Sequence, residues 1–199
     1  MTREEIYASI YTHEEIYRPP QEDSSACLEV ALGCSWGKCK FCDFAKDKFQ
    51  IHPMSKIEWN LRMLGRLEPE KTRLFFLGEN AFVLSFEQLS KIIEMTHTFM
   101  PNIREFSMYA RIDDVLRKTP EELKKLREMG ICDLHIGVES GSDPILLMMN
   151  KGVSSFDMIQ ASDTISPLFW GLAEKTTATF MLWKLPVCST ACIQNAFGR

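Results

Sequence analysis

Residues 27–42 read Cys-Leu-Glu-Val-Ala-Leu-Gly-Cys-Ser-Trp-Gly-Lys-Cys-Lys-Phe-Cys, a short apolar run followed at once by a loop with three cysteines. The apolar run is predicted to be a buried strand. The thiolates of Cys34, Cys39 and Cys42 suit a metal ion or an iron–sulfur cluster. Three ligands are one fewer than a closed four-ligand site requires. The chemistry of the loop therefore depends on whether the fourth position is open to a substrate or cofactor.

The rest of the chain alternates short β-rich runs with capped helices. The predicted strands are Cys27–Leu32, Arg73–Leu77, Glu105–Ala110, Asp133–Val138 and a fifth over Thr176–Leu182. The predicted helices are Thr2–Tyr17 with a Thr2/Glu5 capping box, a helix capped by Ser55 and Glu58 that ends at Leu67, a helix capped by Ser85 and Gln88 that ends near Met100, a helix from Thr119-Pro120 to Gly130, and a helix from Ser154 or Ser155. This alternation is typical of βαβ units, whose parallel strands form a barrel or a doubly wound sheet.

Polar residues and glycines follow each predicted strand directly. The three cysteines follow the first strand, Arg111 follows the third, and the others are Gly78, Glu79 and Asn80 after the second strand and Glu139, Ser140 and Gly141 after the fourth. Because the carboxyl ends of parallel strands share one rim, we expect these residues to converge there.

These motifs resemble the radical S-adenosylmethionine (SAM) superfamily over roughly residues 19–152. The likeness is closest to the subgroup with a Gly-Cys-x-Trp-x-x-Cys-x-Phe-Cys loop, and Gly137-Val138-Glu139-Ser140-Gly141-Ser142-Asp143 with Met149-Asn150-Lys151-Gly152 is similar to its fourth-strand segment. The resemblance implies a radical SAM enzyme with a partial (β/α) TIM-like barrel. It implies a 4Fe–4S cluster and reductive cleavage of SAM to a 5′-deoxyadenosyl radical that acts on an unknown substrate.

The resemblance also assigns roles to individual residues. Cys34, Cys39 and Cys42 would be the cluster ligands, and Phe41 would pack near the adenine of SAM. The segment Gly78-Glu79-Asn80 lies where the family binds the methionine amino group, and a carboxylate there suits an ammonium. The remaining SAM contacts would be Arg111, Glu139 and Ser140. The partners implied are a small-molecule or macromolecular substrate and a low-potential electron donor such as flavodoxin or ferredoxin.

Each assignment has an ordinary alternative. The cysteine loop alone also fits a zinc knuckle with Cys27 or His52 as its fourth ligand. Glu79 fits a solvated turn, Arg111 a surface salt bridge with Asp114, and residues 139–141 a plain turn. A non-catalytic iron–sulfur or zinc-binding remnant of the same scaffold is thus the alternative function. Lone histidines such as His135 are expected to be packed within the fold.

Composition limits the class of protein. Hydrophobic residues make up 45% of the 199 residues, and the net charge of −4 gives no basic surplus for binding nucleic acid. No signal peptide or membrane-spanning run is predicted. Seven cysteines without a secretion signal predict a reducing, cytoplasmic compartment. Cys27 and Cys132 are expected to be buried thiols, and the roles of Cys188 and Cys192 stay open.

Charged residues become sparse after Val153, and the resemblance fades near Ala161. We therefore expect three parts: an N-terminal helix and lead-in over residues 1–25, a radical SAM core over 26–160, and a divergent or truncated tail over 161–199. The remaining length holds no sixth βα unit, so the predicted barrel is incomplete at its C-terminus, with about four to five βα units.

Overall fold

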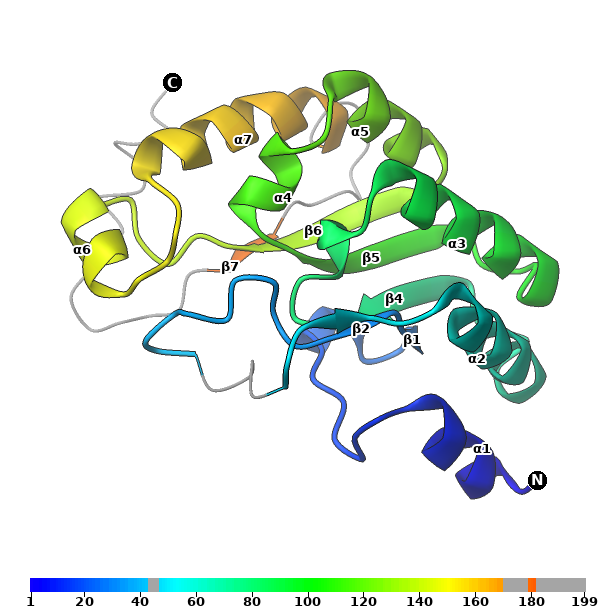
Figure 1. The fold of residues 1–199 in the computed structure, drawn as a ribbon. Helices are drawn as coiled ribbons and strands as arrows, with labels where there is room; N and C mark the ends of the chain where they lie inside the picture. The colour runs from blue at the N-terminus through cyan, green and yellow to red at the C-terminus, as the bar shows by residue number, and fades with distance from the viewer. Residues whose placement is uncertain (43–46, 170–178, 182–199) are drawn as a thin grey trace.

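In the computed structural model, which describes residues 1–42, 47–169 and 179–181, helices and strands alternate along the chain (Figure 1). The strands are β1 (Ala26–Glu29), β2 (Ala31–Leu32), β3 (Gln50–Ile51), β4 (Arg73–Leu77), β5 (Glu105–Ala110), β6 (Ile131–Gly137) and β7 (Thr179–Met181). The helices are α1 (Arg3–Ile10), α2 (Met54–Leu67), α3 (Phe86–Phe99), α4 (Ile112–Leu116), α5 (Pro120–Glu128), α6 (Asp143–Met148) and α7 (Ser155–Phe169), with 3-10 turns η1 (Pro20–Glu22) and η2 (Ala81–Val83).

The main sheet has the strand order β1-β4-β5-β6-β7, and every neighbouring pair is parallel. Strands that are neighbours in this sheet also follow one another along the chain, which is the arrangement of successive right-handed βα units. Strands β2 and β3 form a separate antiparallel pair beside it. The predicted α/β class and partial TIM-like barrel are confirmed.

The two faces of the sheet bury different kinds of residue. Leu28, Phe76 and Ile136 belong to the large apolar core that the sheet shares with the helices α2, α3, α5 and α7, which cover one face in Figure 1. Alternate residues point to the other face, where Cys27 and Phe75 form a small cluster with Leu77. Tyr11 and Ile16, from the N-terminal segment after α1, pack against this cluster, so that segment covers the inner face of the sheet, opposite the large apolar core.

Local sequence signals placed most helix starts correctly. The capping boxes Thr2/Glu5, Ser85/Gln88 and Thr119/Glu122 are all present, each with its side chain accepting a hydrogen bond from the backbone N–H three residues on. The predicted strands Arg73–Leu77 and Glu105–Ala110 match β4 and β5. As expected, Cys27 and Cys132 are buried thiols.

Three predicted elements are wrong in part. Helix α1 ends at Ile10 rather than Tyr17, because Thr12 instead hydrogen-bonds the side chain of Glu29 in β1. Helix α2 starts at Met54 after Pro53 and has no side-chain cap, so Ser55 lies inside its first turn. The predicted strand over 27–32 changes partner at its end, where β2 leaves the main sheet to pair with β3.

The fifth predicted strand is seen as β7, which pairs in parallel with β6. The rest of the predicted strand and Cys188 and Cys192 lie outside the described residues. The division of the chain at residues 25 and 160 stays a prediction. Within the described ranges, no helix has the length and apolar character needed to cross a membrane.

Glu29 ties the N-terminal segment to the sheet. Its carboxylate accepts hydrogen bonds from the backbone and side chain of Thr12 and lies 2.7 Å from Nε2 of the buried His52. Burial alone would raise the pKa of Glu29, but these hydrogen bonds outweigh burial and lower the pKa from 4.5 to about 2.

Because the folded protein binds this proton less readily than the unfolded chain, Glu29 stabilises the fold above pH 4.5. We expect this contribution to be lost progressively as the pH falls from 4.5 toward 2. Denaturant unfolding across this range checks it. Glu29→Gln should flatten the pH dependence, whereas Glu121→Gln on the exposed first turn of α5 should not. An unchanged slope in Glu29→Gln would contradict this account.

Candidate functional site

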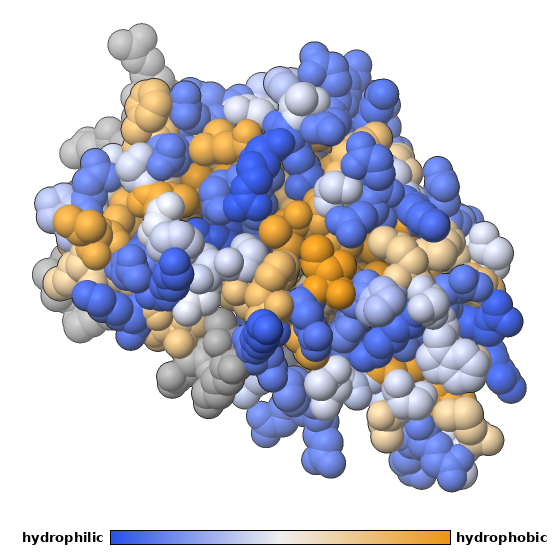
Figure 2. Space-filling view, viewed as in Figure 1, coloured by the Kyte–Doolittle hydropathy of each residue, from blue (hydrophilic) through white to orange (hydrophobic). Residues whose placement is uncertain are grey.

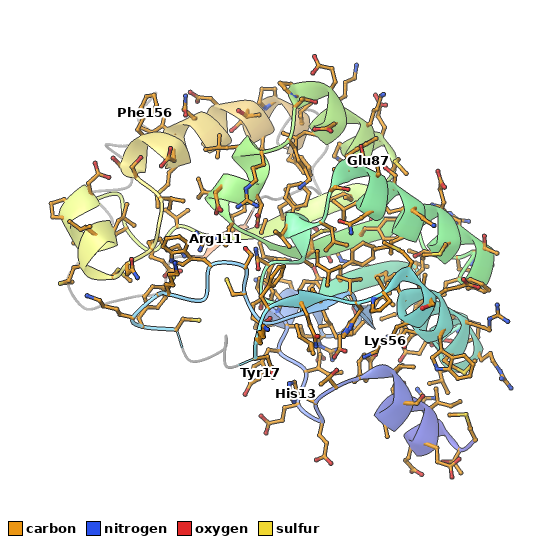
Figure 3. The ribbon with its side chains drawn as sticks, in the orientation of Figure 1. His13, Tyr17, Lys56, Glu87, Arg111 and Phe156 are labelled. Carbon is orange, nitrogen blue, oxygen red and sulfur yellow. The ribbon has the colours of Figure 1, made fainter. Side chains whose placement is uncertain are left out.

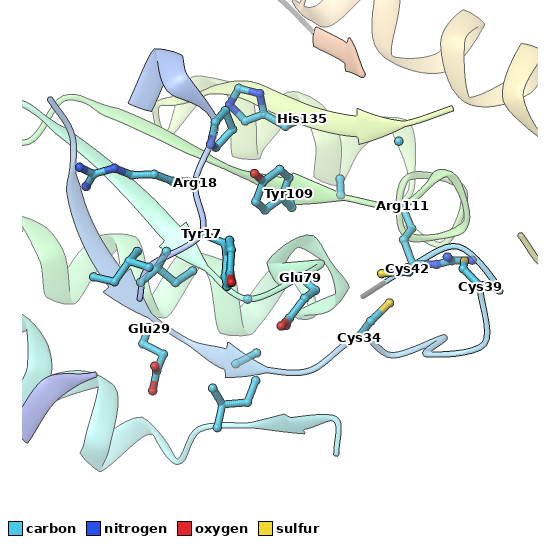
Figure 4. Close-up of a pocket in the computed structure, with 18 of the residues that line it drawn as sticks. Tyr17, Arg18, Glu29, Cys34, Cys39, Cys42, Glu79, Tyr109, Arg111 and His135 are labelled. Atoms are coloured by element: carbon cyan, nitrogen blue, oxygen red, sulfur yellow. The ribbon is translucent and has the colours of Figure 1, made fainter. Parts of the chain in front are cut away.

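A cleft of about 620 Å³ lies on the inner face of the sheet and opens at the carboxyl ends of the strands (Figure 4). Its lining includes most of the residues singled out from the sequence: Cys34, Cys39, Phe41, Cys42, Gly78, Glu79, Arg111 and Glu139. It also includes Tyr109, His135 and Lys151, together with Tyr11, His13 and residues 15–20 of the N-terminal segment. Seven of the ten residues expected to converge at one rim line this cleft, and Phe41 lines it as well. The other three, Asn80, Ser140 and Gly141, are not among its lining residues.

The three cysteines of the loop face this cleft together. Cys34 and Cys39 are half-buried and Cys42 is exposed. Burial raises the pKa of Cys39, the charges of Lys151 and Arg111 lower it, and the neighbouring thiols of Cys34 and Cys42 raise it. The net effect is a raised pKa of Cys39, because burial and the neighbouring sulfurs outweigh the two cations. The three sulfurs and the cations Lys151 and Arg111 lie close enough to influence one another.

The conformation of the cysteine loop is fixed by residues 149–152, which join α6 to α7. Nε1 of Trp36 donates to the carbonyl of Asn150 at 2.8 Å, and Nδ2 of Asn150 donates back to the carbonyl of Lys38 at 2.8 Å. The backbone N–H of Lys40 donates to the carbonyl of Met149 at 3.0 Å. We call these contacts the Trp36 clamp. The sequence marked both segments but did not predict that one holds the other.

Gly152 and Arg111 complete the Trp36 clamp. Gly152 has φ = +78°, and a Cβ there would lie 2.5 Å from the indole ring of Trp36. The Arg111 guanidinium lies 5.5 Å from the centre of that ring and donates to the carbonyl of Lys151 at 3.1 Å. Figure 3 shows Arg111 between the cysteine loop and residues 149–152. Arg111 lines the cleft, and its Nε atom also forms an ion pair with Asp113 at 2.8 Å.

Asn80 supports the cysteine loop from behind. Its side chain accepts a hydrogen bond from the backbone N–H of Ser35 at 3.1 Å and donates to Ser35 Oγ and to Asp114 Oδ2. Asn80 is buried, so in this structure it holds the loop in place instead of lining the cleft.

Glu79 presents a carboxylate to the cleft that lacks a full set of partners. Its Oε2 atom is buried and has no hydrogen-bond partner among the described residues. Burial raises the pKa of Glu79, and the negative charges of Asp47 and Glu29 raise it further. The preceding Gly78 has φ = +134° and lies against Ala31, which brings the backbone close to the first strand. A cation bound at Glu79 would satisfy the orphaned oxygen.

Glu139 is a second carboxylate at the same rim. It has φ = +65°, a conformation that is strained for a residue with a side chain, and it pairs with Lys151 at 3.1 Å. Its Oε2 atom is buried without a partner in the part of the chain that the structure describes. Lys151 also lies 5.6 Å from the ring centre of Phe41. Ser140 is buried and is not among the residues that line the cleft, and its Oγ accepts a hydrogen bond from the N–H of Ser142.

The donor set fits a cluster better than a single zinc ion. Over residues 1–42, 47–169 and 179–181, no three His, Cys, Asp or Glu side chains approach closely enough to hold one metal ion. Both residues considered as a fourth zinc ligand have other partners, since His52 pairs with Glu29 and the Cys27 thiol accepts from Arg18. A 4Fe–4S cluster does not require convergence on one ion, because each cysteine binds a different iron.

The rim beside the cysteine loop is apolar and exposed. On α6 and the start of α7, Leu147, Met148 and Phe156 are 81%, 64% and 63% exposed. Figure 2 shows apolar surface over this end of the molecule. Met149, which accepts the hydrogen bond from Lys40, directly follows this exposed turn, so the apolar surface adjoins the loop that carries the thiols.

Comparison with solved structures shows the same fold in known enzymes. The cobalamin-dependent S-adenosylmethionine radical enzyme OxsB, with aqua-cobalamin bound, aligns with a TM-score of 0.59 and 24% identity over 71% of this chain and 22% of OxsB. The FeFe-hydrogenase maturase HydG from Carboxydothermus hydrogenoformans aligns with a TM-score of 0.53 and 15% identity over 84% of this chain and 38% of HydG.

Sequence comparison gives the family. Heme chaperone HemW of Bacillus subtilis (strain 168) is 30% identical over 117 residues, which cover 54% of this chain and 30% of HemW. The chain thus spans less than a third of the length of that relative. The sequence model of the Radical SAM superfamily matches residues 28–177, from β1 to just before β7. Because this match covers most of the chain, including β4, β5, β6 and the cysteine loop at their rim, the chain belongs to the Radical SAM superfamily.

Proposed function

We propose that this chain binds a 4Fe–4S cluster through Cys34, Cys39 and Cys42 and SAM beside it, and that it cleaves SAM reductively. The observation that carries the proposal is the juxtaposition, in one cleft, of three thiols and two buried carboxylate oxygens that have no partner within the described residues. Three thiols leave one iron open, and the carboxylates suit the cationic and hydroxyl groups of SAM. The subgroup defined by the tryptophan-containing loop stays a prediction.

Individual side chains have distinct tasks in this proposal. Glu79 would accept hydrogen bonds from the ammonium of SAM, and Phe41 would offer its ring to the adenine. Glu139 would accept from the ribose hydroxyls, with Lys151 holding it in place. Arg111 would face the SAM carboxylate and keep the Trp36 clamp closed. Asn80 and Ser140 would act through the backbone segments that they hold, without touching SAM.

When bound, the cluster and SAM supply a 5′-deoxyadenosyl radical, which acts on a substrate that the sequence does not name. The proposed electron donor is a low-potential protein such as flavodoxin or ferredoxin, and the proposed compartment is the cytoplasm. The protein's own contribution is to orient SAM and to exclude water with the N-terminal segment that covers the cleft.

The proposal is tested by forming the cluster anaerobically with iron and sulfide, adding SAM and dithionite, and measuring 5′-deoxyadenosine. We expect 5′-deoxyadenosine to form and to depend on both iron and SAM. Zinc binding without affinity for SAM would instead support the non-catalytic remnant of the same scaffold.

Glu79→Gln should weaken SAM binding by about 10- to 100-fold, since it removes the charge opposite the ammonium but keeps the shape of the side chain. Because burial raises the pKa of Glu79, wild-type binding should weaken as the pH falls, starting at a higher pH than for an ordinary carboxyl group. Equilibrium dialysis with labelled SAM measures both effects. Glu87→Gln on the exposed start of α3 is the control. Equal affinities for Glu79→Gln and wild type would exclude this role.

A further inference from the structure

We propose that Tyr109 and His135, at the inner end of the cleft, form a binding site for a hydroxyl group on an otherwise apolar ligand. This inference names a substrate class for the proposed enzyme and in that sense rests on the proposed function. Binding at the site requires neither cluster nor SAM, so it is tested independently. Figure 4 shows both rings on neighbouring strands, with Tyr17 and Arg18 of the N-terminal segment nearby.

The two residues lie two positions deeper along their strands than Arg111 and Gly137 at the rim. Tyr109 and His135 are register partners on β5 and β6. His135 precedes Gly137, the last residue of β6, by two positions, and Tyr109 precedes Arg111 by two. Since a strand rises about 3.3 Å per residue, they lie roughly 7 Å below Gly137 and Arg111 at the carboxyl ends of these strands. A ligand that reaches them therefore occupies space below the proposed SAM site.

Of the two ring nitrogens of His135, Nε2 has a hydrogen-bond partner and Nδ1 has none among the described residues. Its Nε2 atom lies 3.1 Å from Oε1 of Glu22, which is buried. Burial alone would raise the pKa of Glu22, but hydrogen bonds from Arg73, His135 and Ser25 outweigh it and lower the pKa. An ionised carboxylate only accepts, so Nε2 of His135 carries the hydrogen.

In the tautomer that carries its hydrogen on Nε2, the remaining nitrogen of the imidazole is an acceptor. Nδ1 of His135 is buried and has no hydrogen-bond partner among the described residues. The side chain is 3% exposed and lines the cleft. A buried acceptor without a partner is costly unless a ligand or water donates to it. Nδ1 of His135 would therefore be satisfied by a ligand that donates an O–H or N–H group at the inner end of the cleft.

Tyr109 offers the complementary group. Its ring centre lies 5.9 Å from that of His135 and 5.4 Å from that of Phe75, and it lines the cleft. Burial and the charge of Glu22 raise the pKa of Tyr109 to about 12, so its hydroxyl stays protonated and donates. An alcohol is the small group that donates to one neighbour and accepts from another, as this pair requires.

The other side chains around Tyr109 and His135 favour a ligand that is mostly apolar. Ile16, Pro19 and Leu77 line the same cleft, as does Tyr11, and Phe75 packs behind them. Apolar walls with a few convergent polar groups are typical of small-molecule sites. The ligand class is therefore a largely hydrocarbon compound whose hydroxyl is held between Tyr109 and His135.

The experiment compares two probes on the full chain without cluster or SAM: benzyl alcohol and benzyl methyl ether. The ether keeps the ring and the accepting oxygen but lacks the O–H donor. The readout is the ¹⁵N resonance of His135 Nδ1 in protein labelled at histidine. We expect benzyl alcohol to shift this resonance and to bind roughly 10-fold more tightly than the ether.

Variants separate the site from other binding. Tyr109→Phe removes one hydroxyl only, and we expect it and His135→Gln to lose the preference for the alcohol. His97→Gln on the surface of α3 and Cys34→Ala should keep it. Equal binding of both probes, no binding of the alcohol, or an unchanged preference in Tyr109→Phe would overturn the proposal. Because Cys34→Ala lacks a proposed cluster ligand, retained selectivity there supports the site even if the cluster chemistry fails.

Discussion

Alanine in place of Cys34, Cys39 or Cys42 is expected to abolish stable cluster binding and, with it, all 5′-deoxyadenosine formation. In the proposed cluster each thiolate would hold a different iron. Among the described residues, neither Cys27 nor His52 could readily substitute, because both have other partners. Iron and sulfide content after anaerobic reconstitution measures the first effect, and chromatography of the reaction products measures the second.

The matched control is Cys132→Ser. The Cys132 thiol is buried and donates to the carbonyl of Phe106 at 3.3 Å, a bond that a serine hydroxyl can keep. This variant should bind as much iron as the wild type. Loss of iron in Cys132→Ser but retention in a variant of the cysteine loop would refute the ligand assignment.

Gly152→Ala is expected to destabilise the fold by about 2–5 kcal/mol and to lower cluster content. The residue has φ = +78°, where a side chain costs about 1–2 kcal/mol, and its Cβ would lie 2.5 Å from the Trp36 ring. Relieving that overlap by shifting the clamp costs about 1–3 kcal/mol more. For a chain of this size, the melting temperature should fall by roughly 5–15 °C.

Two comparisons test the cause of this effect. Gly141→Ala, where an added Cβ would meet nothing within 4 Å, should leave the melting temperature nearly unchanged. In a Trp36→Ala background, Gly152→Ala should cost only the conformational part, about 1–2 kcal/mol. The same cost with and without Trp36 would show that the clamp does not depend on this contact.

The sequence predicted the parts of the fold that are decided locally. The capping boxes at Thr2, Ser85 and Thr119 mark helix starts because a side chain and a backbone N–H three residues apart satisfy each other. Likewise, Gly78 and Glu79 could be assigned to the rim because the carboxyl ends of parallel strands share one edge.

Long-range contacts explain what the sequence did not predict. Helix α1 ends at Ile10 because the backbone and side chain of Thr12 donate hydrogen bonds to Glu29 in β1. The Trp36 clamp joins the cysteine loop to residues 149–152, which are more than a hundred positions away in the sequence. His135 was expected to be merely packed. The sequence does not show that Glu22 lies beside its Nε2 atom, or that its Nδ1 atom has no partner in the described part of the chain.

The most direct test of the account is electron paramagnetic resonance of the reconstituted, reduced protein, recorded with and without SAM. The account predicts a 4Fe–4S signal that changes when SAM is added, because the three thiols of the loop leave one iron open to it. A cluster signal indifferent to SAM would contradict the proposed SAM site. Zinc in place of any cluster would contradict the proposed chemistry as a whole.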